Sequence, residues 1–108
     1  MKNITAVIKL DAAMADGKDK DATVIFNGPR RQMLEIKLQN GAVLTRHRAA
    51  EPITVLCISG SGRFFAGEDL DESVEMSPGT LVTLEPDIQH EVAAEPSIHI
   101  LVTKFKEN

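Results

Sequence analysis

The sequence has no Trp and no Tyr, only four Phe, and a single Cys among its 108 residues. So few aromatic rings predict a core of aliphatic side chains. Cys57 has no internal disulfide partner and lies in the apolar run ITVLCISG, where it is expected to behave as a small apolar residue. No stretch approaches the roughly 20 apolar residues of a spanning helix, and the amino terminus has no signal-peptide h-region. These absences predict a cytoplasmic protein with no membrane partner.

Basic residues are also in the minority. Lys and Arg number 12 against 16 Asp and Glu, which gives a net charge of -4. Without a broad basic field, nucleic acid is not expected as a partner. The adjacent Arg30 and Arg31 are interpreted as a solvated strand end rather than a binding patch. The chain length fits one domain.

What the sequence does contain is a repeated period of two. QMLEIKLQNG alternates apolar and charged residues and ends in an Asn-Gly turn at Asn40 and Gly41, which predicts a half-buried strand. ITVLCIS is almost wholly apolar and indicates a strand covered on both faces. Short strands are also expected in TAVIKL, RFFAG, ESVEM, TLVTL, HEV and IHILVTKF. About eight short strands with turns between them are typical of a β-sandwich or β-barrel.

The first part of the chain differs from the rest. DAAMADG is the only candidate helix, and residues 15–23 are rich in Asp and Lys, which predicts a mobile surface loop. The expected organisation is one domain over residues 1–108, with an N-terminal strand and polar loop over 1–23 and a barrel over 24–108.

Two sequence blocks, 41–60 and 79–90, resemble the two motifs of the cupins, which are small jelly-roll β-barrels of the RmlC-like superfamily. The first cupin motif has a glycine, five residues, His-X-His, a glutamate and a closing glycine. Here Gly41 is followed by five residues and His47, and Gly60 closes the block. In the second block Gly79 begins the motif and His90 stands at the histidine position. The resemblance implies an all-β jelly-roll barrel.

The blocks also depart from the family pattern. Ala49 replaces the second histidine, and Ile53 stands where the glutamate would be. In the second block Asp87 takes a glycine position, where a turn remains plausible because Asp tolerates the left-handed conformation. Ala94 replaces the final asparagine. The resemblance is therefore specific for the fold and degraded for the metal chemistry.

Cupins use three histidines and a carboxylate to hold one divalent transition metal, such as Fe, Mn, Ni or Zn, inside the barrel. The resemblance carries two metal ligands over to this chain, His47 and His90. Glu51 and His99 are further candidates, and the register of the last strand decides whether His99 faces the lumen. A metal site generally needs at least three protein ligands.

Two functions from different classes follow. In the first, the barrel binds a small molecule in its lumen without chemistry, in contact with His47, His90, Met33, Leu56 and Ile58. In the second, the protein is a metal-dependent enzyme, a dioxygenase or an isomerase of a small carbonyl or sugar-like substrate. Without a metal, either histidine could act as a general acid or base, because imidazole titrates near neutral pH.

Two further interpretations concern partners. A homodimer is expected because small cupins commonly pair, and the TAVIKL segment could extend a partner's sheet. The chain also resembles the effector-binding cupin module of sugar-responsive transcription factors. Because it has no helix-turn-helix segment, that role would need a separate DNA-binding partner.

Overall fold

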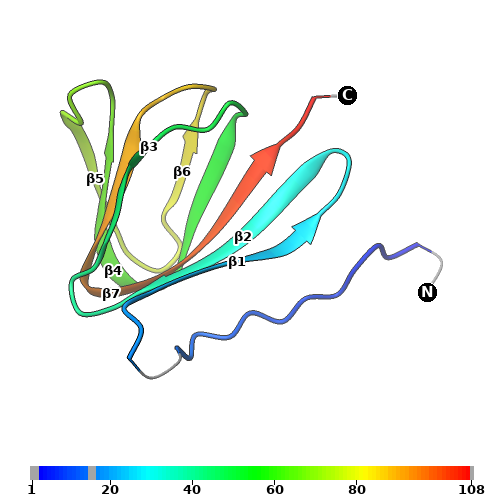
Figure 1. The fold of residues 1–108 in the computed structure, drawn as a ribbon, viewed down its shortest axis with the longest axis horizontal. Helices are drawn as coiled ribbons and strands as arrows, with labels where there is room; N and C mark the ends of the chain where they lie inside the picture. Colours follow the sequence, from blue (N-terminus) through cyan, green and yellow to red (C-terminus); the bar gives the residue numbers. More distant parts are fainter. Residues whose placement is uncertain (1–2, 15–16, 108) are drawn as a thin grey trace.

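A computed structural model describes residues 3–14 and 17–107, and within them the regular structure consists of seven β-strands and no helix (Figure 1). No helix in this part of the chain is long and apolar enough to cross a membrane. The strands are β1 Lys20–Asn27, β2 Arg31–Leu38, β3 Val43–His47, β4 Ile53–Ala66, β5 Glu72–Met76, β6 Leu81–Leu84 and β7 His90–Phe105.

The strands form one antiparallel sheet that folds over on itself. Its path runs β1-β2-β7-β4-β5, with β3 also pairing with β7 and β6 with β4. The long strands β4 and β7 pair along most of their length and bend together, so each contributes to both layers (Figure 1). One layer is β1, β2, the second half of β7, the first half of β4 and β6, and the other is β3, the first half of β7, the second half of β4 and β5. This two-layer arrangement confirms the expected all-β jelly roll.

The bend explains why the number of strands differs from the prediction. ITVLCIS and RFFAG form one continuous strand, β4, and HEV and IHILVTKF form one continuous strand, β7. At the bend, Gly60 has φ +78° and a Cβ built on it would lie 2.3 Å from the carbonyl oxygen of Ser97. Only glycine accommodates both the positive φ and the close backbone approach. The glycines that marked a strand end in the sequence therefore mark a corner within a strand.

Local turn chemistry agrees with the sequence in two places. Asn40 and Gly41 both have positive φ, 57° and 71°, and the Ala42 amide donates to the Gln39 carbonyl at 3.1 Å. This is the geometry of a type I′ turn, which Asn-Gly favours. The turn leads from β2 to β3, which pairs with β7 in the other layer. Asp87, at the expected glycine position, has φ 65°, and its turn is therefore retained.

The amino-terminal part departs from the prediction. Residues 20–23, expected in a polar loop, begin β1, and they pair with β2 from Lys20 opposite Leu38 onward. Tertiary pairing with β2 overrides the low strand propensity of Asp and Lys there. TAVIKL is extended but is not paired as a strand, and residues 11–14 of the expected helix are irregular, while residues 15 and 16 lie outside the described residues.

The core lies between the two layers. As expected from the composition, it is mainly aliphatic, with one buried Phe. The largest fully buried side chains are those of Phe64, Leu38, Met76, Ile100, Val55, Val92 and Cys57. They alternate along their strands with residues of the outer surface, as a folded sheet requires.

Candidate functional site

A cavity of about 180 Å³ opens between the two layers, at the end away from the bend. Most of its wall is apolar and comes from the core faces of β2, β4 and β7, including Ile36, Val55 and Ile100. Three polar side chains also line it: His47, His90 and Lys104. A concave apolar site with a few convergent polar groups is the usual form of a small-molecule site.

The pairing of β3 with β7 brings His47 and His90 together. The two residues lie directly opposite each other in the register, although they are distant in sequence. Their ring centroids are 4.2 Å apart at an interplanar angle of 63°. The convergence that the two motif blocks predicted is therefore present.

Both imidazoles are held by carbonyl groups two residues earlier in the chain. His47 Nδ1 lies 2.7 Å from the Thr45 carbonyl oxygen, and His90 Nδ1 lies 2.9 Å from that of Ile88. A carbonyl only accepts hydrogen bonds, so each Nδ1 carries a proton and donates it. In the neutral rings, Nε2 then keeps its lone pair and is free to accept a proton, a hydrogen bond or a metal.

The two rings differ in their surroundings. His47 is exposed at the mouth of the cavity, whereas His90 is only 4% exposed and stacks on Phe64 with ring centroids 5.7 Å apart. Burial lowers the pKa of His90, and the nearby His47 and Lys104 lower it further, while the hydrogen bond to Ile88 acts in the opposite direction. His90 is therefore held mainly as a neutral imidazole at pH 7.

The positions where the family pattern has its other first-block ligands lie in the same cavity. Ala49 and Ile53 both line it, and both are buried. The backbone thus brings Ala49 and Ile53 to the cavity, as the family pattern implies for these positions, but their side chains are aliphatic and cannot bind a metal. Their effect is to make the cavity more apolar.

The two further candidate ligands are not brought to the histidines. Glu51 is half-buried in the loop before β4 and does not line the cavity, and His99 points to the opposite side of its strand. Within residues 3–14 and 17–107, no group of three or more His, Cys, Asp or Glu is placed to hold a metal ion. His47 and His90 alone fall short of the three protein ligands that a metal site generally needs.

Of the apolar residues expected in the lumen, none lines this cavity. Met33 lines a separate cavity of about 390 Å³ beneath the N-terminal segment, together with Leu101. Leu56 lies directly opposite Leu101 and so shares its outward face. Ile58 is also absent from the lumen wall, whereas Val55 belongs to it. In a strand that is apolar throughout, the sequence does not show which alternate residues face inward.

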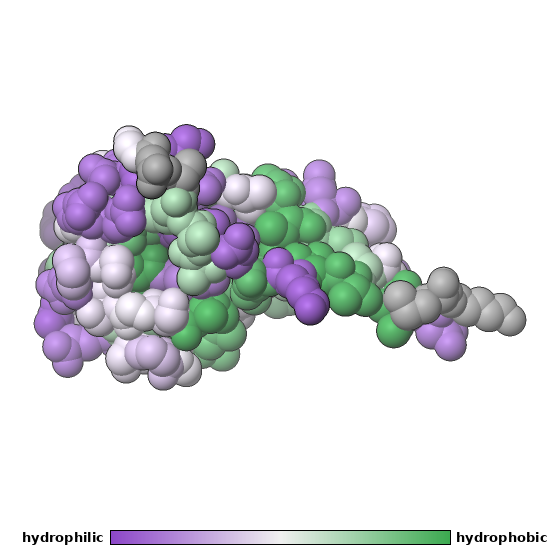
Figure 2. Space-filling view, turned by 90° about the horizontal axis from the view of Figure 1, so that it is seen from below, coloured by the Kyte–Doolittle hydropathy of each residue, from purple (hydrophilic) through white to green (hydrophobic). Residues whose placement is uncertain are grey.

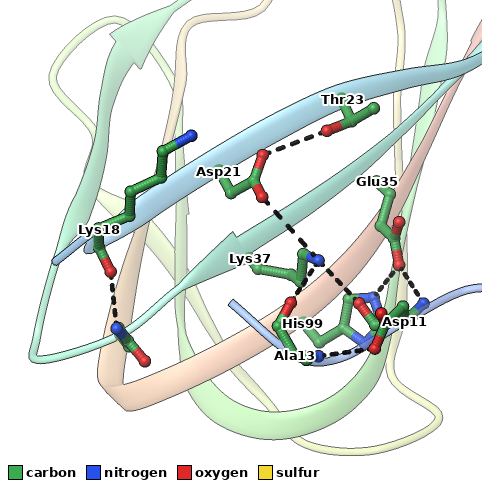
Figure 3. A network of polar contacts seen from close by, with 9 residues as sticks. Asp11, Ala13, Lys18, Asp21, Thr23, Glu35, Lys37 and His99 are labelled. Carbon is green, nitrogen blue, oxygen red and sulfur yellow. Dashed lines mark hydrogen bonds and ion pairs between the residues drawn. The ribbon is translucent and has the colours of Figure 1, made fainter. Parts of the chain in front are cut away.

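His99 belongs instead to a polar cluster on the outer face of the sheet (Figure 3). Its Nε2 is 2.7 Å from Glu35 Oε2, which also accepts a hydrogen bond from the Asp11 amide at 2.9 Å. Lys37 Nζ donates to the carbonyls of Asp11 and Ala13 at 2.8 and 2.7 Å. This cluster fastens residues 11–13 of the N-terminal segment to the sheet.

Lys104 is the lumen residue that the sequence did not reveal. It is the second-last residue of β7, where a lysine normally indicates a solvated strand end. Alternation along the strand puts Ile100, Val102 and Lys104 on one face, and this pattern could have indicated Lys104. Using it would have required the register of β7, which decides whether that face points into the lumen.

Comparisons with known proteins agree with this architecture. No protein-family model matches the sequence, and no curated protein matches it. A cupin-superfamily protein from Desulfitobacterium hafniense DCB-2 has a TM-score of 0.78 at 12% identity, over 88% of this chain and 84% of that chain. An RmlC-like cupin protein from Desulfovibrio desulfuricans has a TM-score of 0.78 at 18% identity, over 93% and 94%. KdgF from a Halomonas species has a TM-score of 0.69 at 19% identity, over 87% and 86%.

At these identities the likeness concerns the fold. It covers most of each chain. The chain therefore has the jelly-roll fold of the RmlC-like cupins.

Proposed function

We propose that this protein binds a small molecule in the cavity between its layers, in contact with His47 and His90. The observation that carries the proposal is the composition of the four motif positions in that cavity. Two retain imidazoles, and two, Ala49 and Ile53, are apolar. Such a wall offers apolar contact area and two hydrogen-bonding groups, which suits binding more than it suits metal coordination.

The binding is tested by filling the cavity. In Ala49→Phe the new ring occupies space beside the imidazoles, while the neighbouring Ala50→Phe places the same ring on the surface, because Ala50 is exposed. A small-molecule library is screened by ¹H–¹⁵N NMR against the natural protein and both variants. Hits that shift amides of the cavity wall, are lost in Ala49→Phe and are kept in Ala50→Phe support the proposal. Hits confined to the outer face, or no hit at millimolar concentration, contradict it.

A second candidate function is that of a metal-dependent enzyme, a dioxygenase or an isomerase of a small carbonyl or sugar-like substrate. It is favoured by the two Nδ1–carbonyl hydrogen bonds, which in neutral rings leave the lone pair on Nε2, and by the 4.2 Å separation of the two ring centroids. Histidines that ligate metals are commonly oriented in this way. Water or substrate would have to complete the coordination of an iron, manganese, nickel or zinc ion, which when bound would polarise an oxygen of the substrate.

Elemental analysis by plasma mass spectrometry separates the two candidates. The protein is purified without a chelator or a histidine tag, beside the His47→Ala, His90→Ala double variant, and is quantified by amino-acid analysis because it has no Trp or Tyr. Near-stoichiometric metal that is lost in the double variant supports the enzyme. Protein that stays empty after incubation with the four metal salts favours the binding protein.

An enzyme without a metal would use one of the two histidines as a general acid or base. His90 is neutral at pH 7 and its Nε2 is free, which makes it the better placed base of the pair. Replacing His90 by Asn would then abolish turnover of any substrate found in the screen, measured at a substrate concentration that saturates the variant. Unchanged turnover would exclude this role.

We also propose a homodimer, paired through the outer face that carries the N-terminal segment. Apolar surface gathers on this face (Figure 2), and its exposed side chains include Val7 at 70% and Leu81 at 60%. Among the described residues, the backbone of 3–10 makes no hydrogen bond with the rest of the chain. An extended segment with free amides and carbonyls pairs readily with a strand of a second copy, and a two-fold interface needs only one self-complementary patch.

Size-exclusion chromatography with light scattering tests the dimer at micromolar concentration. Val7→Glu and Leu81→Glu are expected to give monomers, because each puts a charge into the proposed interface. Val74→Glu is the matched control, since Val74 is 45% exposed on β5 of the other layer. A natural protein that elutes as a monomer, or a dimer that all three variants retain, contradicts the proposal.

A further inference from the structure

Lys104 places a positive charge in the lumen. It lies on β7 opposite Gln32 of β2 and Ile53 of β4, and Ile53 lines the same cavity. Residues 100 and 102 precede it on the lumen side, whereas the intervening Leu101 lines the cavity on the outer face. The lysine is half-buried, so part of its side chain is withdrawn from water.

Nothing in the described part of the cavity wall balances this charge. No Asp or Glu is among the described residues that line it, and no described carboxylate lies within 4.0 Å of Lys104 Nζ. Lys37, on the other face of the same sheet, shows the contrast: it has two carbonyl partners and lies 3.9 Å from Asp21. A cation beside an apolar wall is poorly stabilised without a partner, so an anion bound in the cavity would be stabilised by Lys104.

The imidazoles share this environment. Burial is the main cause that lowers the pKa of His90, and the charges of His47 and Lys104 act in the same direction. Lys104 and His90 line the same cavity. A negatively charged group beside Lys104 would give its ammonium group a partner and would accept a charge-assisted hydrogen bond from it.

We infer that the ligand of this cavity is a small carboxylate with an apolar body, whose carboxylate pairs with Lys104. The inference rests on the proposed binding function and adds the charge class of the ligand. The aliphatic wall around Val55 and Ile100 accepts the apolar body. Lys104 is then a specificity-determining residue, because uncharged molecules of the same shape leave its charge without a partner.

The test uses hexanoate, with hexanamide and hexanol as uncharged probes of the same body, and inorganic phosphate as an anion without one. Affinities and shifted amides are measured by ¹H–¹⁵N NMR for the natural protein and for Lys104→Gln, Lys104→Arg and Lys20→Gln. Lys20 is exposed at the start of β1 and is the matched control. Circular dichroism of each variant checks that it is folded.

Hexanoate is expected to shift cavity amides and to bind at least about tenfold more tightly than hexanamide, the usual order of a charge-assisted hydrogen bond. Lys104→Gln is expected to remove that advantage and to leave hexanamide binding unchanged, whereas Lys104→Arg and Lys20→Gln keep it.

Three results would overturn the inference, and they are distinguishable. If all three probes of the same body bind in the cavity equally well, the charge class is wrong but the binding function stands. If phosphate binds more tightly than hexanoate, the site is an anion site without a need for an apolar body. If no probe shifts a cavity amide of the natural protein, both the inference and the proposed binding function fail.

Discussion

Replacing Glu35 should release the N-terminal segment and destabilise the whole domain. Glu35 is 7% exposed, and its Oε2 accepts hydrogen bonds from His99 Nε2 and from the Asp11 amide. In Glu35→Ala both donors lose their acceptor, and His99 Nδ1 is already a buried atom without a partner among the described residues. The imidazole would then be buried with neither nitrogen satisfied.

The expected loss is about 3–6 kcal/mol of unfolding free energy. The two hydrogen bonds to the carboxylate are charge-assisted and contribute about 1.5–3 kcal/mol each, which gives this range. For a domain with a typical total of about 5–15 kcal/mol, this is a large fraction. Glu35→Gln keeps one accepting oxygen and should lose less. A Glu35→Leu, His99→Leu double variant should recover part of the loss, because it removes the buried imidazole and leaves only the Asp11 amide without its acceptor.

The assay is urea unfolding followed by far-ultraviolet circular dichroism, because the chain has no Trp or Tyr fluorophore. Glu75→Ala is the control, since Glu75 is 3.5 Å from Arg63 but its side chain is 82% exposed, and surface pairs contribute about 0–1 kcal/mol. Hydrogen exchange at the Asp11 amide reports release of the segment. If Glu35→Ala and Glu75→Ala lose equal stability, or if Asp11 stays protected, the cluster does not hold the segment.

Three other outcomes follow from the structure. Gly60→Ala should lose about 1–3 kcal/mol of unfolding free energy from backbone strain, and more from the clash of the new Cβ with the Ser97 carbonyl. Gly41→Ala should lose only the strain term, because Gly41 also has positive φ but no atom lies within 4 Å of the new Cβ; equal melting temperatures of the two variants would contradict this. Because the pKa of His90 is lowered in the folded protein, the unfolded chain binds more protons at this site, and stability should fall as the pH drops from the unfolded pKa of about 6.5 through the folded pKa. The plot of stability against pH should be less steep in His90→Asn, and identical slopes would refute the lowered pKa of His90. Burial raises the pKa of the Cys57 thiol, so a thiol reagent at pH 8 should react slowly until urea is added, and fast reaction in the native protein would show that the thiol is accessible.

Much of the fold could be predicted from local chemistry. Alternating apolar residues in β2 and the Asn40–Gly41 turn are determined over a few residues, because a strand has a period of two and a type I′ turn needs two positive φ angles. The resemblance to the cupin motifs implied one lumen for His47 and His90. The strand and the turn depend on short stretches that have nearly one stable conformation.

The strand boundaries were harder to predict. Gly60 after an apolar run predicts a strand end, yet β4 continues through it because the paired β7 bends at the same place. Likewise β1 begins at Lys20 in a stretch whose composition is that of a loop. Pairing with a neighbour provides hydrogen bonds that a local propensity does not include.

The residue pattern predicts a small β-domain, and the resemblance to the cupin motifs implies that two histidines share one cavity. The tertiary structure decided the other contents of that cavity: Lys104 enters it, while His99, Met33 and Leu56 face outward. Alternation along a strand says which residues share a face but not which face is inside, and only the register between distant strands resolves that choice. For the same reason, the hydrogen bond between Glu35 and His99, which are 64 residues apart, could not be predicted from the sequence around either residue.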